Sequence, residues 1–328
     1  MQSSTRQFAP DLLKAIAIFG VVYIHSIWMV GENATVYITW IFRAAVPCFL
    51  MMFSYFMARS LSRQEHPWRY IGKRFLHILT VFIVWSLAYS LFREEWLMPT
   101  LLKFAIRHFG GGSWPGQFFF FILLQLIPLF PVLVWAYNRP ALRIGILAFS
   151  AATYLVFGYA HHLVPEILLQ LKMRPFFHSI PYVFAGIALS RGQLPRLSGW
   201  WTAAIVLIPL EFFILSLLGR EHDAYVTPGV AIASILISTS VLQLRLNPPR
   251  NPLVSGFICF AGANTMTIFV ANPLAARLLA RFTHDWRPVD PAPWLEIPLS
   301  FLFASIVLVM CCGMAWLIKR IRLEGIIN

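Results

Sequence analysis

Charged residues are scarce in this chain. Only 12% of its 328 residues are Asp, Glu, Lys or Arg, whereas 59% are hydrophobic. A soluble domain usually contains about 25% charged residues, so this composition excludes an ordinary soluble protein. The sequence instead predicts a polytopic membrane protein whose outer surface contacts lipid.

Acidic residues are the scarcer of the two charged kinds, with 13 Asp and Glu against 26 Lys and Arg and a formal net charge of +13. Such an excess can indicate a nucleic-acid partner. Here, however, the basic residues are spread between long apolar stretches and form no basic domain. Their distribution favours a membrane protein with positively charged loops and argues against nucleic-acid binding.

Cysteine is also rare, and its spacing is uninformative for metal binding. The four cysteines lie inside apolar stretches, and no pair has the C-x-x-C spacing. We therefore expect small buried hydrophobic residues, with no metal site and no disulfide framework. The first apolar stretch lacks a small-residue cleavage site, so we expect it to remain as an uncleaved helix.

Long hydrophobic stretches dominate the rest of the sequence. A membrane-spanning helix needs about 20 mainly apolar residues, and this criterion predicts about ten spans. No internal repeat stands out, which favours a single membrane-embedded domain over residues 1–328 and an all-α bundle. The predicted spans lie near residues 11–30, 38–58, 74–92, 117–137, 141–159, 176–190, 200–218, 228–244, 253–276 and 296–318.

An even number of spans places both termini on one side of the membrane. Placing them in the cytoplasm assigns most of the loop Lys and Arg residues to the inner side, as short loops of membrane proteins require. We therefore predict a protein of the cytoplasmic membrane with both termini inside. The outer loops are longer, and loop 277–295 contains Trp286 and Asp290. Such residues suit either an interfacial aromatic belt, which we favour, or sugar binding.

The first predicted helix contains a polar stripe made of Asp11, Lys14 and His25. Eleven residues return a helix to within about 20° of its starting direction, so Lys14 and His25 share one face at a separation of about 16 Å. Ionisable groups in a membrane cost a few kcal/mol and usually mark function. His25 is the candidate catalytic base, because imidazole titrates near neutral pH. The alternative is a histidine that only bonds a neighbouring helix.

Basic residues gather at the inner end of this stripe. Arg69, Lys73 and Arg74 open the third predicted helix at a depth close to that of Lys14. Several fixed cations at one membrane mouth attract phosphates, which predicts a phosphorylated cytosolic cofactor. Two alternatives remain open, namely a positive-inside anchor and, for Lys14 with Asp11, a local ion pair.

Arg43 enters the second predicted helix from the outer side, at a depth similar to that of His25. A guanidinium there needs a partner. It either binds an oxyanion or phosphate of the substrate or pairs with Glu211 in the seventh span, and the sequence leaves both open. Ser54 is either an acyl acceptor or, as we favour, a serine at a helix interface.

The residues above resemble the acyltransferase 3 family of integral membrane acyltransferases. The pattern Asp11-x-x-Lys14-x10-His25 is similar to the basic-residue-x10-His signature of that family. The stretch from Arg43 to Tyr55 and the segment beginning at Lys73 are also similar to family sequences. Looser similarity is found in Phe118–Pro131, Tyr182–Ala188 and Gly262–Pro273, so the resemblance covers almost the whole chain.

The resemblance implies a ten-helix membrane bundle that uses acyl-CoA, usually acetyl-CoA from the cytoplasm. The acceptor would be a hydroxyl of a cell-surface polysaccharide or of its lipid-linked precursor. His25, with Asp11 on the same face, would carry catalysis, by direct transfer or through an acyl-histidine. The rival interpretation is a transporter or flippase of a lipid-linked glycan in which the stripe lines a path without acyl chemistry. A scaffold subunit with a decayed site ranks last.

Several positions depart from the family pattern. Lys14 stands where Arg is more frequent, which keeps the charge but loses the planar guanidinium. Tyr55 replaces a glycine, Gly116 and Phe118 stand where many members have His and Trp, and Asn272 replaces a frequent His before a proline. These departures concern the outer acceptor site and a second histidine, and they leave the first-helix signature intact.

Overall fold

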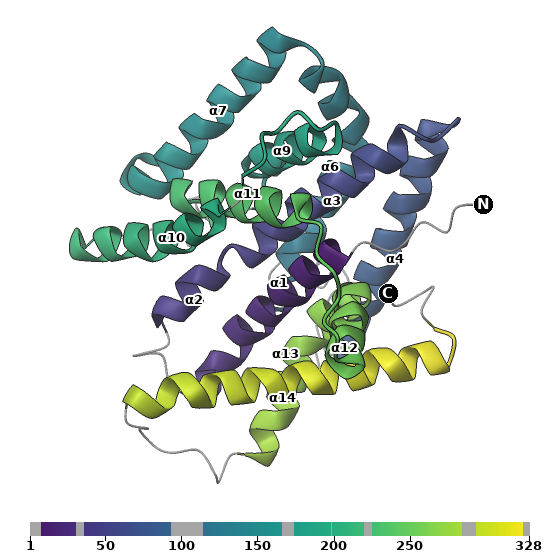
Figure 1. The fold of residues 1–328 in the computed structure, drawn as a ribbon, viewed down its shortest axis with the longest axis vertical. Helices are drawn as coiled ribbons and strands as arrows, with labels where there is room; N and C mark the ends of the chain where they lie inside the picture. Colours follow the sequence, from purple (N-terminus) through teal and green to yellow (C-terminus); the bar gives the residue numbers. More distant parts are fainter. Residues whose placement is uncertain are drawn as a thin grey trace, which may run out of the picture.

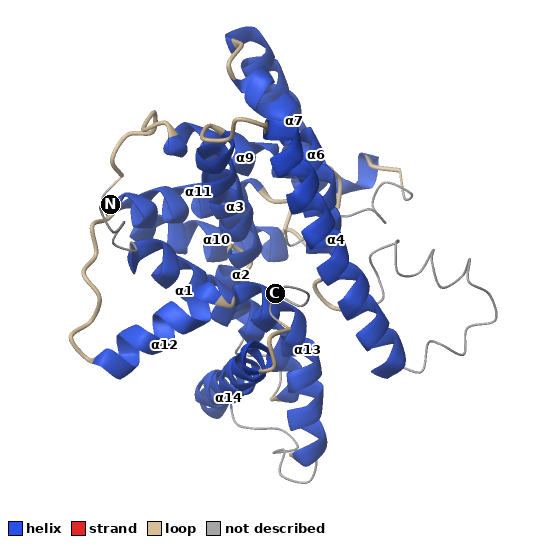
Figure 2. Ribbon diagram, turned by 90° about the vertical axis from the view of Figure 1, so that its right-hand side faces the viewer, coloured by secondary structure: helices blue, strands red, loops and turns tan. Residues whose placement is uncertain are grey.

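The computed structural model describes residues 8–30, 36–92, 114–165, 174–197, 199–219, 225–283 and 293–323. The regular structure of these residues is entirely helical, as Figures 1 and 2 show. The outer-loop residues Trp286 and Asp290 lie outside the described ranges. The elements are α1 (Phe8–Ser26), η1 (Ile27–Met29), α2 (Val36–Phe42), α3 (Ala45–Leu61), α4 (Pro67–Phe92), α6 (Gln117–Tyr137), α7 (Pro140–Tyr159), η3 (His161–Leu163), η4 (Phe176–Ser179), α9 (Ile180–Ser190), α10 (Trp200–Leu217), α11 (Pro228–Gln243), α12 (Pro252–Ala263), α13 (Thr265–Phe282) and α14 (Pro293–Arg320).

The polytopic all-α architecture is confirmed, but the expected number of about ten spans is too high. Seven helices of the described residues are long and apolar enough to cross a membrane, or eight if a bent pair counts as one span. Two further apolar helices, Phe176–Ser190 and Pro228–Gln243, are shorter. Both α9 and α11 have a proline in the first turn, where the missing N–H prevents the α-helix from extending further upstream.

The stretch 253–276, which we expected to form one straight span, is instead broken. It consists of α12 and α13, which meet at an angle of 89°. At the break, Asn264 Nδ2 donates a hydrogen bond to the carbonyl of Phe260 at 2.7 Å, so its amide binds a carbonyl in the last turn of α12. The bend gives α12 and α13 separate contacts with α1.

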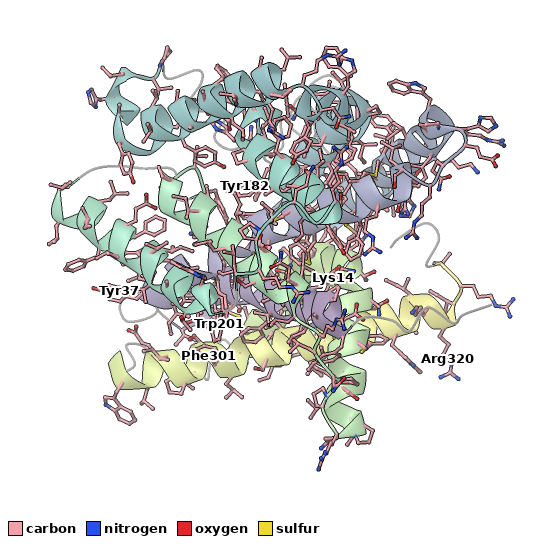
Figure 3. All side chains as sticks on the ribbon, turned by 45° about the horizontal axis from the view of Figure 1, so that its top comes forward. Lys14, Tyr37, Tyr182, Trp201, Phe301 and Arg320 are labelled. Atoms are coloured by element: carbon pink, nitrogen blue, oxygen red, sulfur yellow. The ribbon has the colours of Figure 1, made fainter. Side chains whose placement is uncertain are left out.

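Helix α1 lies at the centre of the bundle. It contacts α2, α3, α11, α12, α13 and α14, and Figure 1 shows it between α3 and α14. Ile18, Val22 and Tyr23 on this helix are fully buried. In Figure 3, Lys14 lies in the middle of the molecule, whereas Arg320 projects at the end of α14. The polar stripe of α1 is therefore surrounded by protein.

Close helix packing depends on glycine at two positions. On α9, a Cβ at Gly186 would lie 2.7 Å from both the Met51 carbonyl oxygen and Ser54 Cβ on α3. On α12, a Cβ at Gly262 would lie 2.6 Å from the Asp11 carbonyl oxygen. Ser54 is fully buried and donates to the Leu50 carbonyl at 2.8 Å, so its expected place at a helix interface is confirmed.

Candidate active site

His25 and Lys14 both belong to the continuous helix α1, which keeps them on one face about 16 Å apart. Trp28 follows in η1 and donates its indole N–H to the His25 carbonyl at 2.7 Å, which satisfies one of the free carbonyls at the end of α1. The His25 side chain itself is only partly buried. His25 lies in the last turn of α1.

The His25 ring is held by Asn272 of α13. His25 Nδ1 lies 2.6 Å from Asn272 Oδ1. Asn272 Nδ2 donates to the carbonyls of Phe269 at 2.6 Å and Ile268 at 3.2 Å, so the amide oxygen must face the histidine. His25 Nδ1 then carries the proton, and Nε2 keeps its lone pair. Nε2 accepts no hydrogen bond from a described residue, which leaves it ready to act as a base.

Pro273 explains why Asn272 adopts this orientation. A proline inside a helix has no N–H for the carbonyl four residues earlier. That carbonyl belongs to Phe269, and it accepts the Asn272 side chain instead. The Asn-Pro pair in α13 thus supplies both a free carbonyl and the amide that binds it.

Arg43 lies at the break between α2 and α3, and not inside a continuous helix as we expected. Its guanidinium carbon is 4.8 Å from the centre of the Tyr225 ring, and the Tyr225 ring is 5.8 Å from that of Phe118. Arg43 Nε is buried and donates to no described residue, while its charge interacts electrostatically with His25. A partly unsatisfied cation and two aromatic rings therefore lie on the His25 side of the site.

Glu211 forms its hydrogen bonds with other partners. Its carboxylate accepts hydrogen bonds from the hydroxyl of Tyr159 and from the backbone N–H of Gly229, the latter at 2.9 Å and 3.0 Å. Gly229 is in the first turn of α11, where a carboxylate is stabilised by free N–H groups and by the helix dipole. The hydrogen bonds of Glu211 thus go to these partners and not to Arg43. A contact of Glu211 with substrate stays a prediction.

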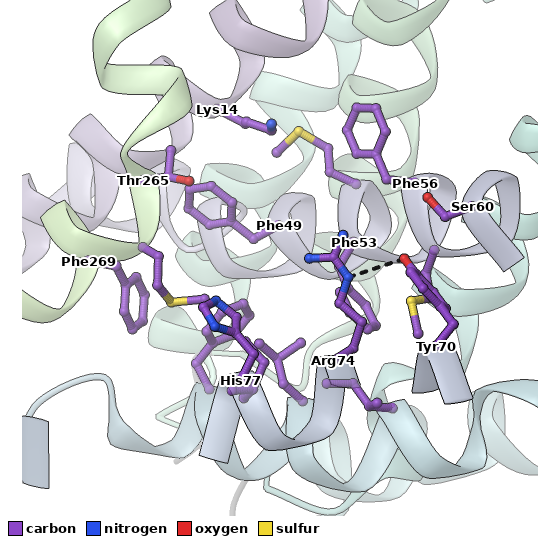
Figure 4. A pocket seen from close by; sticks show the side chains of 17 residues that line it. Lys14, Phe49, Phe53, Phe56, Ser60, Tyr70, Arg74, His77, Thr265 and Phe269 are labelled. Carbon is purple, nitrogen blue, oxygen red and sulfur yellow. Dashed lines mark hydrogen bonds between the residues drawn. The ribbon is translucent and has the colours of Figure 1, made fainter. Parts of the chain in front are cut away.

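A cavity of about 300 Å³ lies at the Lys14 end of the stripe (Figure 4). Polar groups on its wall come from α1, α3, α4 and α13, and the remainder of the wall is apolar. Arg74 donates its Nε–H to the Tyr70 hydroxyl at 3.3 Å, and Lys14 Nζ is 5.1 Å from the Phe56 ring centre. The lining residues are Lys14, Phe49, Met52, Phe53, Phe56, Met57, Ser60, Tyr70, Arg74, His77, Ile78, Phe119, Leu123, Ile127, Thr265, Met266 and Phe269.

The cavity opens toward a basic surface, which we call the basic mouth. Two further pockets adjoin the cavity, and Tyr70 lines all three. Their walls contain five cations, of which Arg69 and Lys73 are exposed and Arg74 also lines the cavity. The cations of the basic mouth are Arg59, Arg63, Arg69, Lys73 and Arg74.

Asp11 lies in the first turn of α1, only 4% exposed and close to Gly262 of α12. The helix rise between Asp11 and His25 is on the order of 20 Å, so the two side chains do not meet. A catalytic contribution of Asp11 stays a prediction, and the geometry restricts it to the inner end.

The structure thus groups the predicted residues into two parts. The first part consists of Lys14 and Arg74, which line the cavity, with Arg69 and Lys73 at the basic mouth. The second part is His25, which lies beyond the end of the cavity where Phe119 and Phe269 stand. The first part has the charge to hold phosphates, and the second part has a base held in one tautomer. Together they suit the transfer of a group from a phosphorylated donor to a nucleophile near His25.

Comparison with known proteins agrees with this arrangement. The family model of the acyltransferase domain matches residues 8–318, which is nearly the whole chain. The chain belongs to the acyltransferase 3 family. It is therefore a membrane acyltransferase, and the matched region includes both the basic mouth and the His25–Asn272 pair. Neither the curated proteins nor the solved structures contain a match to this chain.

Four residues of this acyltransferase 3 site were not singled out from the sequence. His77 lines the cavity one helical turn after Lys73 and Arg74. Its spacing of four residues from Lys73 and three from Arg74 could have predicted that it shares their helix face. Phe269 similarly precedes Asn272 by three residues on α13. Tyr70 and Tyr225 had no such signal, because a single tyrosine near a basic run or in a loop has many structural uses.

Proposed function

We propose that this membrane acyltransferase transfers an acetyl group from cytosolic acetyl-CoA to a hydroxyl of a cell-surface polysaccharide or of its lipid-linked precursor. The observation that carries the proposal is the order of three features, namely the basic mouth, the cavity that Lys14 lines, and His25 behind the Phe269 end of that cavity. A transporter would not need a histidine fixed in one tautomer behind such a cavity.

The charge of the basic mouth suits the donor. Coenzyme A carries a 3′-phosphate and a pyrophosphate, and guanidinium groups bind phosphate oxygens in pairs. Five cations of this chain surround the opening, and Lys14 adds another inside. Beyond them the wall is largely apolar, with His77 and Thr265 as polar groups, which suits a pantetheine arm with few charges. The arm is long enough to bridge the roughly 16 Å from Lys14 to His25.

The reaction follows from the state of His25. The acceptor hydroxyl oxygen attacks the thioester carbonyl carbon while Nε2 takes the hydroxyl proton. The carbon–sulfur bond then breaks, and the proton passes from the imidazolium to the leaving thiolate. Asn272 stabilises the imidazolium through Nδ1–H, and Arg43, whose charge acts on His25, is our candidate to stabilise negative charge on the acyl oxygen.

The outer end supplies acceptor contacts. Arg43 has a buried N–H with no partner among the described residues, and Tyr225 and Phe118 present aromatic rings beside it. Aromatic faces pack against sugar rings, and a guanidinium binds a hydroxyl or a lipid-linked phosphate.

The excess of basic residues at the mouth supports a cytoplasmic donor side, with both termini inside.

Binding of acetyl-CoA to the detergent-purified protein tests the donor assignment. A ligand that binds only the folded state stabilises it, by about 2.7 kcal/mol at 100 times its Kd. We expect acetyl-CoA to raise the Tm of the wild type, to have little effect on Lys14→Ala, and to stabilise Lys14→Arg, which keeps the charge. A folded wild type with no Tm increase would contradict the proposal and favour the transporter, which glycolipid movement would then test.

A further inference from the structure

One face of α13 connects the cavity to His25. Thr265, Phe269 and Asn272 are spaced by four and three residues, so they lie on the same side of the helix. Thr265 and Phe269 line the cavity, and Asn272 holds the histidine ring. Phe269 is therefore the last residue of this face that a group entering from the cavity meets before His25. Figure 4 shows Phe269 at the opposite end of the lining from Tyr70.

The Phe269 ring fills the space between the two parts of the site. It is 3% exposed and packs against the Phe119 ring at a centroid distance of 5.1 Å. It also approaches Gly116 so closely that a Cβ there would lie 2.9 Å from Phe269 Cε1. The same Cβ would lie 3.8 Å from His25 Cε1, so Gly116 borders both rings.

Gly116 has a backbone reason to be glycine as well. Its φ is +86°, in the left-handed region that other residues rarely adopt. Because any larger residue would also push the Phe269 ring, the first turn of α6 and the ring form one wall. His25 is not among the residues that line the cavity, which agrees with a closed wall at this end.

We propose that Phe269 is a selectivity residue that keeps the bound thioester away from His25 until the acceptor is in place. This inference rests on the proposed function. Without the ring, a water molecule beside His25 would meet the thioester directly. Its oxygen would bond to the acyl carbon, the carbon–sulfur bond would break, and His25 would pass the water proton to the thiolate. The products would be acetate, a proton and free coenzyme A. The ring thus directs transfer to the acceptor hydroxyl by excluding water from the reacting atoms.

Release of coenzyme A thiol without any acceptor tests the inference. We expect Phe269→Ala to hydrolyse acetyl-CoA at least tenfold faster than the wild type. Adding His25→Ala to this variant should return hydrolysis to the wild-type rate, because His25 is the base that the hydrolysis needs. Phe82→Ala is the matched control, since Phe82 is a 1% exposed ring on α4 outside the cavity lining. Phe82→Ala should lower the stability about as much as Phe269→Ala does, but it should leave hydrolysis at the wild-type rate.

The Tm increase with acetyl-CoA separates the two possible failures. If wild type and Phe269→Ala are both stabilised by acetyl-CoA but hydrolyse it equally slowly, Phe269 is not the wall and the proposed function stands. Faster hydrolysis that persists in the double variant of Phe269→Ala and His25→Ala likewise overturns the inference. If the wild type is not stabilised at all, the donor assignment fails and this inference fails with it. Phe269→Leu, which keeps an apolar side chain without the ring, carries the same test if Phe269→Ala does not fold.

Discussion

At the scale of single residues, the hydrogen bond between His25 and Asn272 decides which ring nitrogen of His25 carries the proton. A departure from the family pattern, asparagine in place of histidine before Pro273, turns out to provide an uncharged acceptor for Nδ1–H. An amide does not change its charge with pH, so it holds one histidine tautomer over a wide range. The pair explains how His25 can serve as a base without a second titratable partner.

Substitution of Asn272 should slow the reaction without weakening donor binding. Asn272→Ala removes one hydrogen bond to the reacting histidine, which corresponds to about tenfold in kcat, and KM for acetyl-CoA should not change. Loss of the base itself in His25→Ala should cost more, about 10²- to 10⁴-fold. Steady-state kinetics of the purified protein would measure both.

Asn251→Ala is the control for this experiment. Asn251 accepts from the backbone N–H of Leu253 at 2.9 Å at the start of α12, so its loss should lower Tm and leave kcat unchanged. Wild-type kcat in Asn272→Ala would show that the hydrogen bond has no role in catalysis.

At the scale of helices, contact between α3 and α9 is set by a glycine. The Cβ that Gly186 lacks would collide with backbone atoms of α3, and backbone cannot move aside as a flexible side chain can. Periodicity in the sequence identified both helices but not this approach, because the distance between two helices depends on which faces meet. The same argument applies to the 89° bend at Asn264, where the apolar pattern runs through without a break.

Adding a methyl group at Gly186 should therefore destabilise the fold. We expect Gly186→Ala to cost about 1–3 kcal/mol by overpacking, seen as a lower Tm in detergent. Gly145 in α7 is a matched control, because a Cβ there meets no atom within 4 Å. Gly145→Ala should raise the Tm or leave it unchanged, since alanine is the better helix former. Equal Tm values for the two variants would mean that α9 shifts freely on α3.

At the scale of the whole molecule, the proposed donor and acceptor sites lie toward opposite ends of α1. The basic mouth lies at the Lys14 end, and Arg43 with Tyr225 lies at the His25 end. Acetyl-CoA is highly charged and does not cross a lipid bilayer unaided. The proposed function therefore predicts that the donor arrives from one side of the membrane only.

Sealed membrane vesicles can test this sidedness. Inverted vesicles, which expose the cytoplasmic surface, should transfer labelled acetyl groups from added acetyl-CoA to membrane or surface glycan. Right-side-out vesicles should not, until the membrane is permeabilised. Equal labelling of both kinds of intact vesicle would place the donor site on the outer surface or require transport of acetyl-CoA.

The sequence by itself determined the class of the protein and the first part of its site. Composition and apolar length predicted an all-α membrane protein, because lipid permits only long apolar helices across it. The spacing of Lys14 and His25 placed both on one face, because contacts within one helix follow from its period.

Only the tertiary structure decided the contacts between helices. It brought Asn272 to His25 from a segment far along the chain and paired the Glu211 carboxylate with the backbone at the start of α11. It also placed Phe269 between the rest of the cavity and His25. Among the described residues it also showed seven or eight candidate spans where ten were expected, and it bent α12 from α13. Such features depend on the relative positions of several helices, which are set by packing between surfaces distant in sequence and not by the local pattern of any one of them.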